Sequence, residues 1–443
     1  MLSRTRQSSL GLCVSVLAVG LTGCQMGPSA LKVSNAHYSD AVRIANSEQL
    51  LVNLVRLRYR DLPVFLSVSS ISTQFEFNSS GSIEGDIVEN VSVNSISRQF
   101  ALDSSGGVSG SVGQSIGGSG ARTPDSLSLG AGVSYSERPT ITFSALGGEA
   151  FQKRMLGPLK VAVIALLGES GWRGDRVLRM TVEELNGLNN ASRASGPTPS
   201  HSPSIRDFQE AVGLLRKLID ARLISFEYET RTDTISSPIP SSQVDGADII
   251  AAGKAGGEFK LTEDGKGLLL TMERRVLVMR IPPESDASPE VVQLRKLLRL
   301  KPGQTRYDVV ALEDSELDPF KPSQPIGELA VDTRSLMGVL YYLSNGVEPP
   351  PEHERAGLVT VTVDENGVPF SWSEVLDDLF RVRSSAWPPR NAAVAVRHRG
   401  YWFYIADDDE TSKSTFLLLE QLFSLQAGEV EEQKPVLTLP VGG

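Results

Sequence analysis

Residues 126–136, with the sequence SLSLGAGVSYS, constrain the fold more than any other segment because apolar and small residues alternate strictly along them. Five residues of one parity fall on one face of such a strand: Leu127, Leu129, Ala131, Val133 and Tyr135. The segment carries no charge, and neither does the Gly/Ser-rich stretch 104–121 before it. A strand of this kind needs an apolar layer of protein or of lipid against one face.

The linker Arg122-Thr123-Pro124-Asp125 joins the two charge-free stretches and is polar and turn-forming. Two strands of about 9–11 residues joined by a charged tip are what a membrane-spanning hairpin requires. One hairpin cannot satisfy its backbone hydrogen bonds in lipid, so several copies of the chain would have to pool them. The first stretch has few apolar residues, and the sequence therefore favours a flexible Gly/Ser loop beside a soluble strand. A membrane hairpin over 104–136 is the alternative.

The rest of the chain alternates between helical and strand periodicity. Apolar residues spaced three and four apart predict helices at 39–59, 148–168 (broken at Gly157-Pro158), 204–221, 289–300, 333–344, 371–383 and 410–426. Period-two patterns predict strands at 71–77, 176–182, 223–229, 258–262, 268–272, 275–281, 306–312 and 358–363, and a strand hairpin around Arg399-Gly400 at 393–405. The predicted class is α+β, with mixed sheets, flanking helices and an extended β-hairpin or Gly/Ser-rich segment in the N-terminal half.

Two linkers rich in Ser, Pro and Gly or in Pro and Glu mark the expected domain boundaries, at 189–204 and 348–354. We therefore expect three α+β domains: an N-terminal domain (38–188) with a Gly/Ser-rich insertion (104–125), a central domain (205–347) and a C-terminal domain (355–443). A length of 443 residues is compatible with this division.

The first residues have the pattern of an export signal. Arg4 and Arg6 precede an uncharged apolar run, residues 10–22, which is too short to span a bilayer as a helix. The run ends in Leu21-Thr22-Gly23-Cys24, which resembles the lipobox of bacterial lipoproteins. The resemblance implies that residues 1–23 are removed and that Cys24 carries the acyl chains, and it implies no assigned activity.

The same resemblance implies a location. The residue after the cysteine is Gln25 rather than the Asp that signals inner-membrane retention in this class, so we expect a lipid anchor in the outer membrane. Residues 24–37 form an expected short tether with a reach of at most roughly 45 Å. The predicted partners are membrane lipid, through the acyl chains, and further copies of the chain or other envelope proteins.

Residues with catalytic or metal-binding chemistry are sparse. Of two cysteines, Cys13 lies in the removed segment, so the mature chain has no thiol pair. The four histidines are scattered, with His353 in a linker and His398 on a strand, and none has ligand spacing. Asp407-Asp408-Asp409-Glu410 is either a helix N-terminus or a calcium site. We predict no catalytic residue, no metal and no cofactor apart from the covalent lipid.

The net charge of −10, without a long basic run, argues against a nucleic-acid partner. Three functions follow, in order of preference. The first is a non-enzymatic structural or assembly role for a membrane-anchored lipoprotein. The second is a subunit of an oligomeric outer-membrane pore that contributes a β-hairpin. The third is a periplasmic hydrolase or ligand-binding module.

Overall fold

The computed structural model describes residues 26–427 except 92–93, 103–107, 116–125, 193, 200–204, 263, 318–323 and 364–365. Cys24, the removed segment and the C-terminal KPVLTLPV lie outside the described residues. The chain forms two compact units. Unit 1 contains the described residues up to Phe65 and from Leu146 onward, and unit 2 contains those from Leu66 to Ala145.

The first element is a helix of 33 residues, α2 (Met26–Arg58), which is about 50 Å long. It includes the predicted helix at 39–59 but begins earlier, so residues 26–38, most of them in the expected tether, are helical. Pro28 falls in the first turn, where proline is tolerated, and good helix formers such as Ala30 and Leu31 follow. Residues 26–38 therefore reach only about 20 Å.

The other helices of unit 1 are short. They are α3 (Glu149–Leu156), α4 (Val161–Glu169), α5 (Gly174–Thr181), α6 (Arg206–Asp220), α7 (Gly246–Lys254), α8 (Pro289–Leu297), α9 (Leu336–Ser344), α10 (Pro351–Arg355), α11 (Ser373–Leu376) and α12 (Glu410–Ala427). Most predicted helices are confirmed, including the break at Gly157-Pro158. The predicted strand at 176–182 is wrong for residues 176–181, which are helical and bury Val177 and Met180, three apart, on one face.

The described residues of unit 1 form two sheets. The larger has the order β6-β5-β12-β11-β10-β7, and β8 and β9 also pair with β10. Its strands are β5 (Val182–Leu185), β6 (Leu188–Asn189), β7 (Ser225–Thr234), β8 (Ile239–Pro240), β9 (Gly257–Leu261), β10 (Gly267–Arg280), β11 (Arg306–Ala311) and β12 (Glu328–Thr333). The β11–β12 pair is parallel and the others are antiparallel, so the sheet is mixed. The smaller sheet joins β13 (Arg383–Ser385), β15 (Tyr401–Ala406) and β14 (Ala392–His398).

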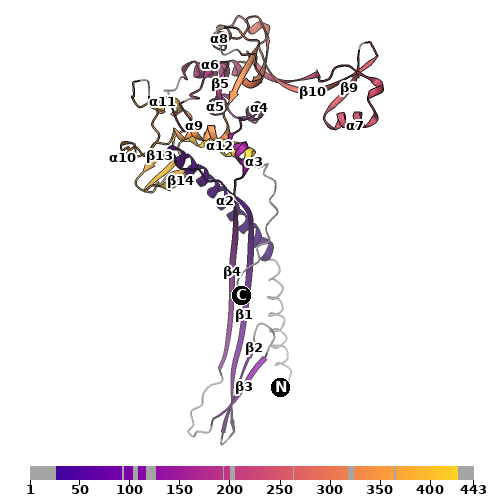
Figure 1. Cartoon of the computed structure of the whole chain (residues 1–443). Coiled ribbons are helices and arrows are strands. Elements are labelled where there is room, and N and C mark those ends of the chain that lie inside the picture. The colour runs from indigo at the N-terminus through magenta and orange to yellow at the C-terminus, as the bar shows by residue number, and fades with distance from the viewer. Residues whose placement is uncertain are drawn as a thin grey trace. The chain divides into compact units, whose positions relative to one another are not determined.

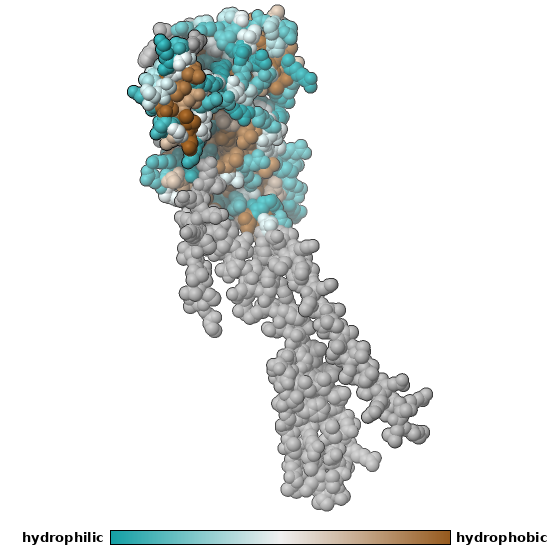
Figure 2. All heavy atoms as spheres, turned by 90° about the vertical axis from the view of Figure 1, so that its right-hand side faces the viewer, coloured by the Kyte–Doolittle hydropathy of each residue, from teal (hydrophilic) through white to brown (hydrophobic). Residues whose placement is uncertain are grey.

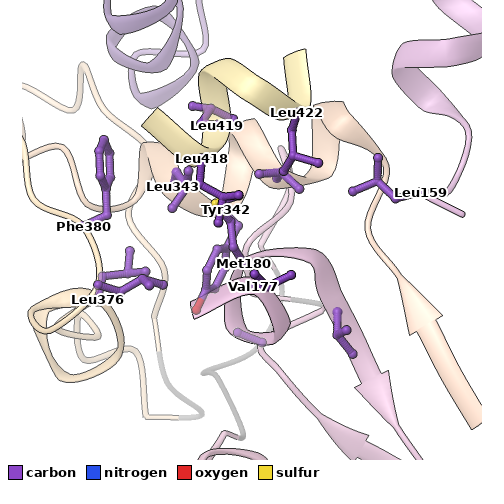
Figure 3. Close-up of a cluster of buried hydrophobic side chains, with 14 of the residues drawn as sticks. Leu159, Val177, Met180, Tyr342, Leu343, Leu376, Phe380, Leu418, Leu419 and Leu422 are labelled. Atoms are coloured by element: carbon purple, nitrogen blue, oxygen red, sulfur yellow. The ribbon is translucent and has the colours of Figure 1, made fainter. Parts of the chain in front are cut away.

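One hydrophobic core runs through unit 1, from Leu50 in α2 to Leu422 in α12. Helix α9 lies within it, with Val339, Leu340 and Tyr342 completely buried, and Figure 3 shows the side chains of α5, α9 and α12 gathered together. The face of unit 1 that Figure 2 shows is mostly hydrophilic, with a few apolar patches. The domain boundaries expected at 189–204 and 348–354 both fall inside this unit, because the core continues across them.

Unit 2 is a single antiparallel sheet of four strands in the order β3-β2-β1-β4. The strands are β1 (Leu66–Val91), β2 (Asn94–Leu102), β3 (Val108–Ser115) and β4 (Ser126–Ala145). Figure 1 shows β1 and β4 side by side as a long ribbon, with β2 and β3 beside the C-terminal part of β1. The α+β class with an extended hairpin element in the N-terminal half is confirmed.

Two expectations about this region are wrong. Residues 108–115 are not a loop but a strand paired with β2. The described residues 108–115 also do not pair with 126–136, because β3 and β4 lie at opposite edges of the sheet. β1 continues through residues 79–89, beyond the strand predicted at 71–77. Ile83 and Ile87 keep the parity of Phe75 and Phe77.

Among the described residues, no helix combines the length and the hydropathy needed to cross a membrane.

Candidate functional site

The sheet of unit 2 has two chemically different faces. Residues directly opposite each other on paired strands share a face, so the register assigns every position: Phe77 pairs with Tyr135, Ile83 with Leu129 and Gly85 with both Leu127 and Phe100. We call the side that carries these residues the apolar face. Among its apolar positions are Phe75, Phe77, Ile83, Ile87, Ile96, Phe100, Leu102, Val108, Val112, Leu127, Leu129, Ala131, Val133 and Tyr135.

The opposite side, the polar face, is built from small and polar residues. Along β4 it carries Ser126, Ser128, Gly130, Gly132, Ser134 and Ser136, and along β3 it carries Ser109, Ser111, Gly113 and Ser115. Its charged positions are Glu76, Glu84, Asp86 and Arg138. A register shift between Val68 and Ser70 keeps Leu66 and Val68 on the apolar face, opposite Ala145 and Phe143.

Charges bound a limited band of the apolar face. Glu137 lies opposite Phe75 at one end, and Arg98 lies opposite Ile87 at the other. Between Phe77 and Ile87 the apolar face has no charge on β1 or β4. Ten residue steps measure about 33 Å along a strand, or about 25 Å along the membrane normal at the tilt of about 40° found in membrane sheets. The band therefore has the height of a lipid-facing surface, and Phe75, Phe77 and Tyr135 gather at one border.

Both edges of the sheet are open in the part of the chain that the structure describes. There, β3 pairs only with β2, and β4 pairs only with β1. All three neighbouring pairs, β3–β2, β2–β1 and β1–β4, are antiparallel, so the two edge strands β3 and β4 run in opposite directions. The β4 edge of one chain can therefore pair in antiparallel fashion with the β3 edge of a second chain, for any number of chains.

Unit 1 contains a cavity of about 290 Å³ where α2 and α9 end. Five of its lining residues are buried and polar: Arg58, Ser195, Ser344, Asn345 and Thr360. The other lining residues are Leu57, Arg60, Asp61, Leu62, Pro63, Gly196, Pro197 and Tyr341. The Arg58 guanidinium donates to Asn345 Oδ1 at 3.1 Å, and Arg60 Nε donates to Thr360 Oγ1 at 2.9 Å.

A cluster around Tyr59 brings together two histidines that the sequence separates. Tyr59 Oη lies 2.7 Å from His353 Nδ1, and its ring contacts the His398 ring edge-on at 5.3 Å between centroids. His398 Nε2 lies 3.2 Å from Asp61 Oδ2, and Arg399 donates to the same carboxylate. Asp61 therefore joins this cluster to the cavity. The sequence offered no signal for it, because the two histidines are 45 residues apart on different elements.

The electrostatics of this cluster favour neutral side chains. Burial lowers the pKa of His398 below its ordinary value, with Arg399 and Arg56 acting in the same direction and Asp61 opposing them. Burial also raises the pKa of Tyr59 to about 12. A neutral imidazole hydrogen-bonded to a carboxylate is chemically able to accept a proton. The contacts of His398 also serve to connect β14 to the end of α2.

The acidic run at 407–410 has a structural place in the fold. Asp409 Oδ1 accepts the Ser412 N–H at 2.9 Å, which is the N-cap interaction of α12, and Asp407 pairs with Lys413 at 3.2 Å. Within the described ranges, His, Asp and Glu residues form no group of three with the geometry of a metal site. This arrangement accounts for the run as the start of a helix.

Comparison with protein-family models, with characterised proteins and with solved structures gave no match to this chain.

Proposed function

We propose that this chain is a lipid-anchored outer-membrane protein whose copies pool their four-stranded sheets into an oligomeric pore. The observation that carries the proposal is the two-faced sheet of unit 2, with an apolar face along β4 and a Ser/Gly-rich polar face on the other side. Lipid is the partner that accepts a continuous apolar face, and water accepts the polar face. The sequence alone favoured a structural or assembly role; the extent of this sheet favours the pore.

The open edges support the oligomer. In lipid every backbone N–H and C=O must be paired, so a sheet with free edges cannot stay there alone. Pairing of β3 with β4 of the next copy removes both edges, and the charge-free residues 126–135 of β4 supply the length that β3 (Val108–Ser115) requires. The acyl chains on Cys24 hold each copy at the membrane until the sheets join, since two or three chains anchor firmly.

The polar face supports a preference for cations. In such a pore it lines the lumen, and within the band it carries Glu84 and Asp86 without a basic residue on the same face. Rings of carboxylates favour cations over anions in channels. The expected measurement is a reversal potential that shows cation preference in a KCl gradient across a planar bilayer.

The ends of unit 2 allow a decisive experiment. Leu146 N–H donates to Phe65 C=O at 2.9 Å, so the chain leaves and re-enters unit 1 at hydrogen-bonded neighbours. Replacing residues 66–145 by Asn-Gly, a favoured two-residue turn, should leave unit 1 folded and anchored. We expect the wild-type protein in non-ionic detergent to be oligomeric and to form channels, and the replacement variant to do neither.

Two results would contradict the proposal. One is a wild-type protein that is monomeric in detergent and does not conduct in a bilayer. The other is a replacement variant that keeps the native size. A Cys24→Ser variant separates anchoring from assembly, because it should lose acylation and membrane association and keep a folded unit 1.

A further inference from the structure

We infer that the cavity at the ends of α2 and α9 binds a small organic anion, with its oxyanion group held by Arg58 and Arg60. This inference concerns unit 1 alone and does not rest on the proposed pore. The cavity of about 290 Å³ lies just below the usual range for small-molecule sites, and apolar residues such as Leu57, Leu62 and Pro197 line it beside the polar ones.

The Arg58 side chain is a buried cation with too few partners. Arg58 is only 8% exposed, yet in the part of the chain that the structure describes it forms no ion pair and its Nε–H has no acceptor. A buried guanidinium is costly unless carboxylate or phosphate oxygens accept its N–H groups. An oxyanion in the cavity would supply those oxygens in the bidentate geometry that a guanidinium favours.

The second observation is the backbone conformation of Arg60. Helix α2 ends in a Schellman motif, with Arg60 N–H donating to Leu57 C=O at 3.1 Å and Asp61 N–H donating to Arg56 C=O at 2.8 Å. Arg60 occupies the left-handed position of this motif, with φ +59°, where glycine is the favoured residue. An arginine there is less favourable for the backbone than glycine and places a second guanidinium at the cavity.

The charge balance of the cavity remains positive when the helix ends are included. The C-termini of α2 and α9 each carry a partial negative charge of roughly half a unit, which together offset about one guanidinium. Asp61, the only acidic lining residue, already accepts hydrogen bonds from Arg399 and approaches His398. Among the described groups that line the cavity, one cationic group is therefore left to attract an anion; Glu354, which acts electrostatically on Arg58, does not line it.

A matched pair of variants tests the site. Arg60→Gly removes a guanidinium from the cavity and relieves the left-handed backbone. Arg222→Gly makes the same change at the equivalent position after α6, where Arg222 (φ +57°) follows the same motif and does not line the cavity. Both variants should fold, since glycine suits both positions. Binding of benzoate, phenyl phosphate and uncharged benzyl alcohol to the full chain in non-ionic detergent is then measured by calorimetry.

We expect the wild-type chain and Arg222→Gly to bind benzoate or phenyl phosphate at one site per chain. The preference between these two identifies the oxyanion as carboxylate or phosphate. Arg60→Gly should bind about tenfold more weakly, and Arg58→Met should lose binding while keeping its melting temperature or raising it. The inference is overturned if neither anion binds saturably, if benzyl alcohol binds equally well, or if Arg60→Gly and Arg222→Gly bind alike.

Discussion

Unit 1 and unit 2 differ in how their apolar residues are covered. Unit 1 buries them in one core to which helices and both of its sheets contribute, whereas the described part of unit 2 is one sheet layer. Soluble domains are built from at least two packed layers, because the apolar side of one element must be covered by another. Unit 1 follows that rule by itself. A sheet with one apolar face and one layer requires a second layer from outside the sheet.

The largest effect should come from the core of unit 1. Phe208 in α6 is 1% exposed, and Phe208→Ala should lower the free energy of unfolding by about 3–5 kcal/mol because it leaves a cavity. All four tryptophans, at 172, 372, 387 and 402, lie in unit 1, so urea unfolding followed by tryptophan fluorescence reports on that unit. The matched variant Ile83→Ala in unit 2 should leave this transition unchanged. A similar shift for both variants would show that the units unfold as one.

The next effect concerns the two faces of unit 2. Ala131 lies on the apolar face opposite Gly81, and Ser128 lies on the polar face opposite Glu84. Ala131→Arg should cost about 2–4 kcal/mol per copy if lipid covers the apolar face, and the oligomer should be lost. Ser128→Arg should be tolerated and should reduce cation preference, because the new charge lies beside Glu84. Loss of assembly with Ser128→Arg, or retention with Ala131→Arg, would reverse the assigned faces.

A smaller effect is expected at the start of α12. Asp409 caps this helix through the Ser412 N–H and Oγ–H, at 2.9 and 2.8 Å. Asp409→Ala should lower the stability of unit 1 by about 1 kcal/mol, while Asp409→Asn should retain most of it. The same urea titration measures both variants. Loss of stability on addition of a calcium chelator would instead support the calcium alternative for the run at 407–410.

The smallest effect is a dependence of unit 1 on pH. Burial lowers the pKa of His398 in the folded chain, so the unfolded chain binds more protons once the pH falls below about 6.5. The contribution of His398 to the stability of unit 1 should therefore be fully present above that pH and should decrease as the pH falls toward the pKa of His398 in the folded chain. His398→Asn should flatten this part of the profile, as measured by urea unfolding between pH 7.5 and 5. An unchanged slope in the variant would remove His398 as the cause.

The local sequence pattern was sufficient to predict most elements of unit 1 and insufficient to predict which elements lie next to each other. The helix at α6 could be predicted from its single apolar stripe, and the β14–β15 hairpin from Arg399-Gly400 at its turn. Residues 176–181 could not, because Val177 and Thr181 favour a strand locally and only burial against the core selects the helix. The predicted helix at 371–383 is reduced to α11, and 358–363 forms only an isolated bridge, from Val363 to Pro369.

The candidate sites, too, could be predicted only as far as the local sequence pattern reaches. The apolar face of β4 was visible in the alternation from Leu127 to Tyr135, and the register adds its partners on β1. The partners of β3 and β4 could not be predicted, since alternation assigns a face to a residue and assigns no neighbour to a strand. The cavity was not predicted at all. Arg58, Ser195, Asn345 and Thr360 come from distant segments that only the fold brings together.

The hydrogen bond between Phe65 and Leu146 also determines how the length of unit 2 can change. Because the chain leaves and returns at neighbouring residues, β1 and β4 can gain or lose residues together without moving anything in unit 1. A gain of two residues in each strand lengthens the ribbon by about 6.6 Å and preserves both faces, whereas a gain of one exchanges them. The length of this ribbon is thus adjustable only in steps of two residues per strand, each step about a quarter of the thickness of a lipid-facing band.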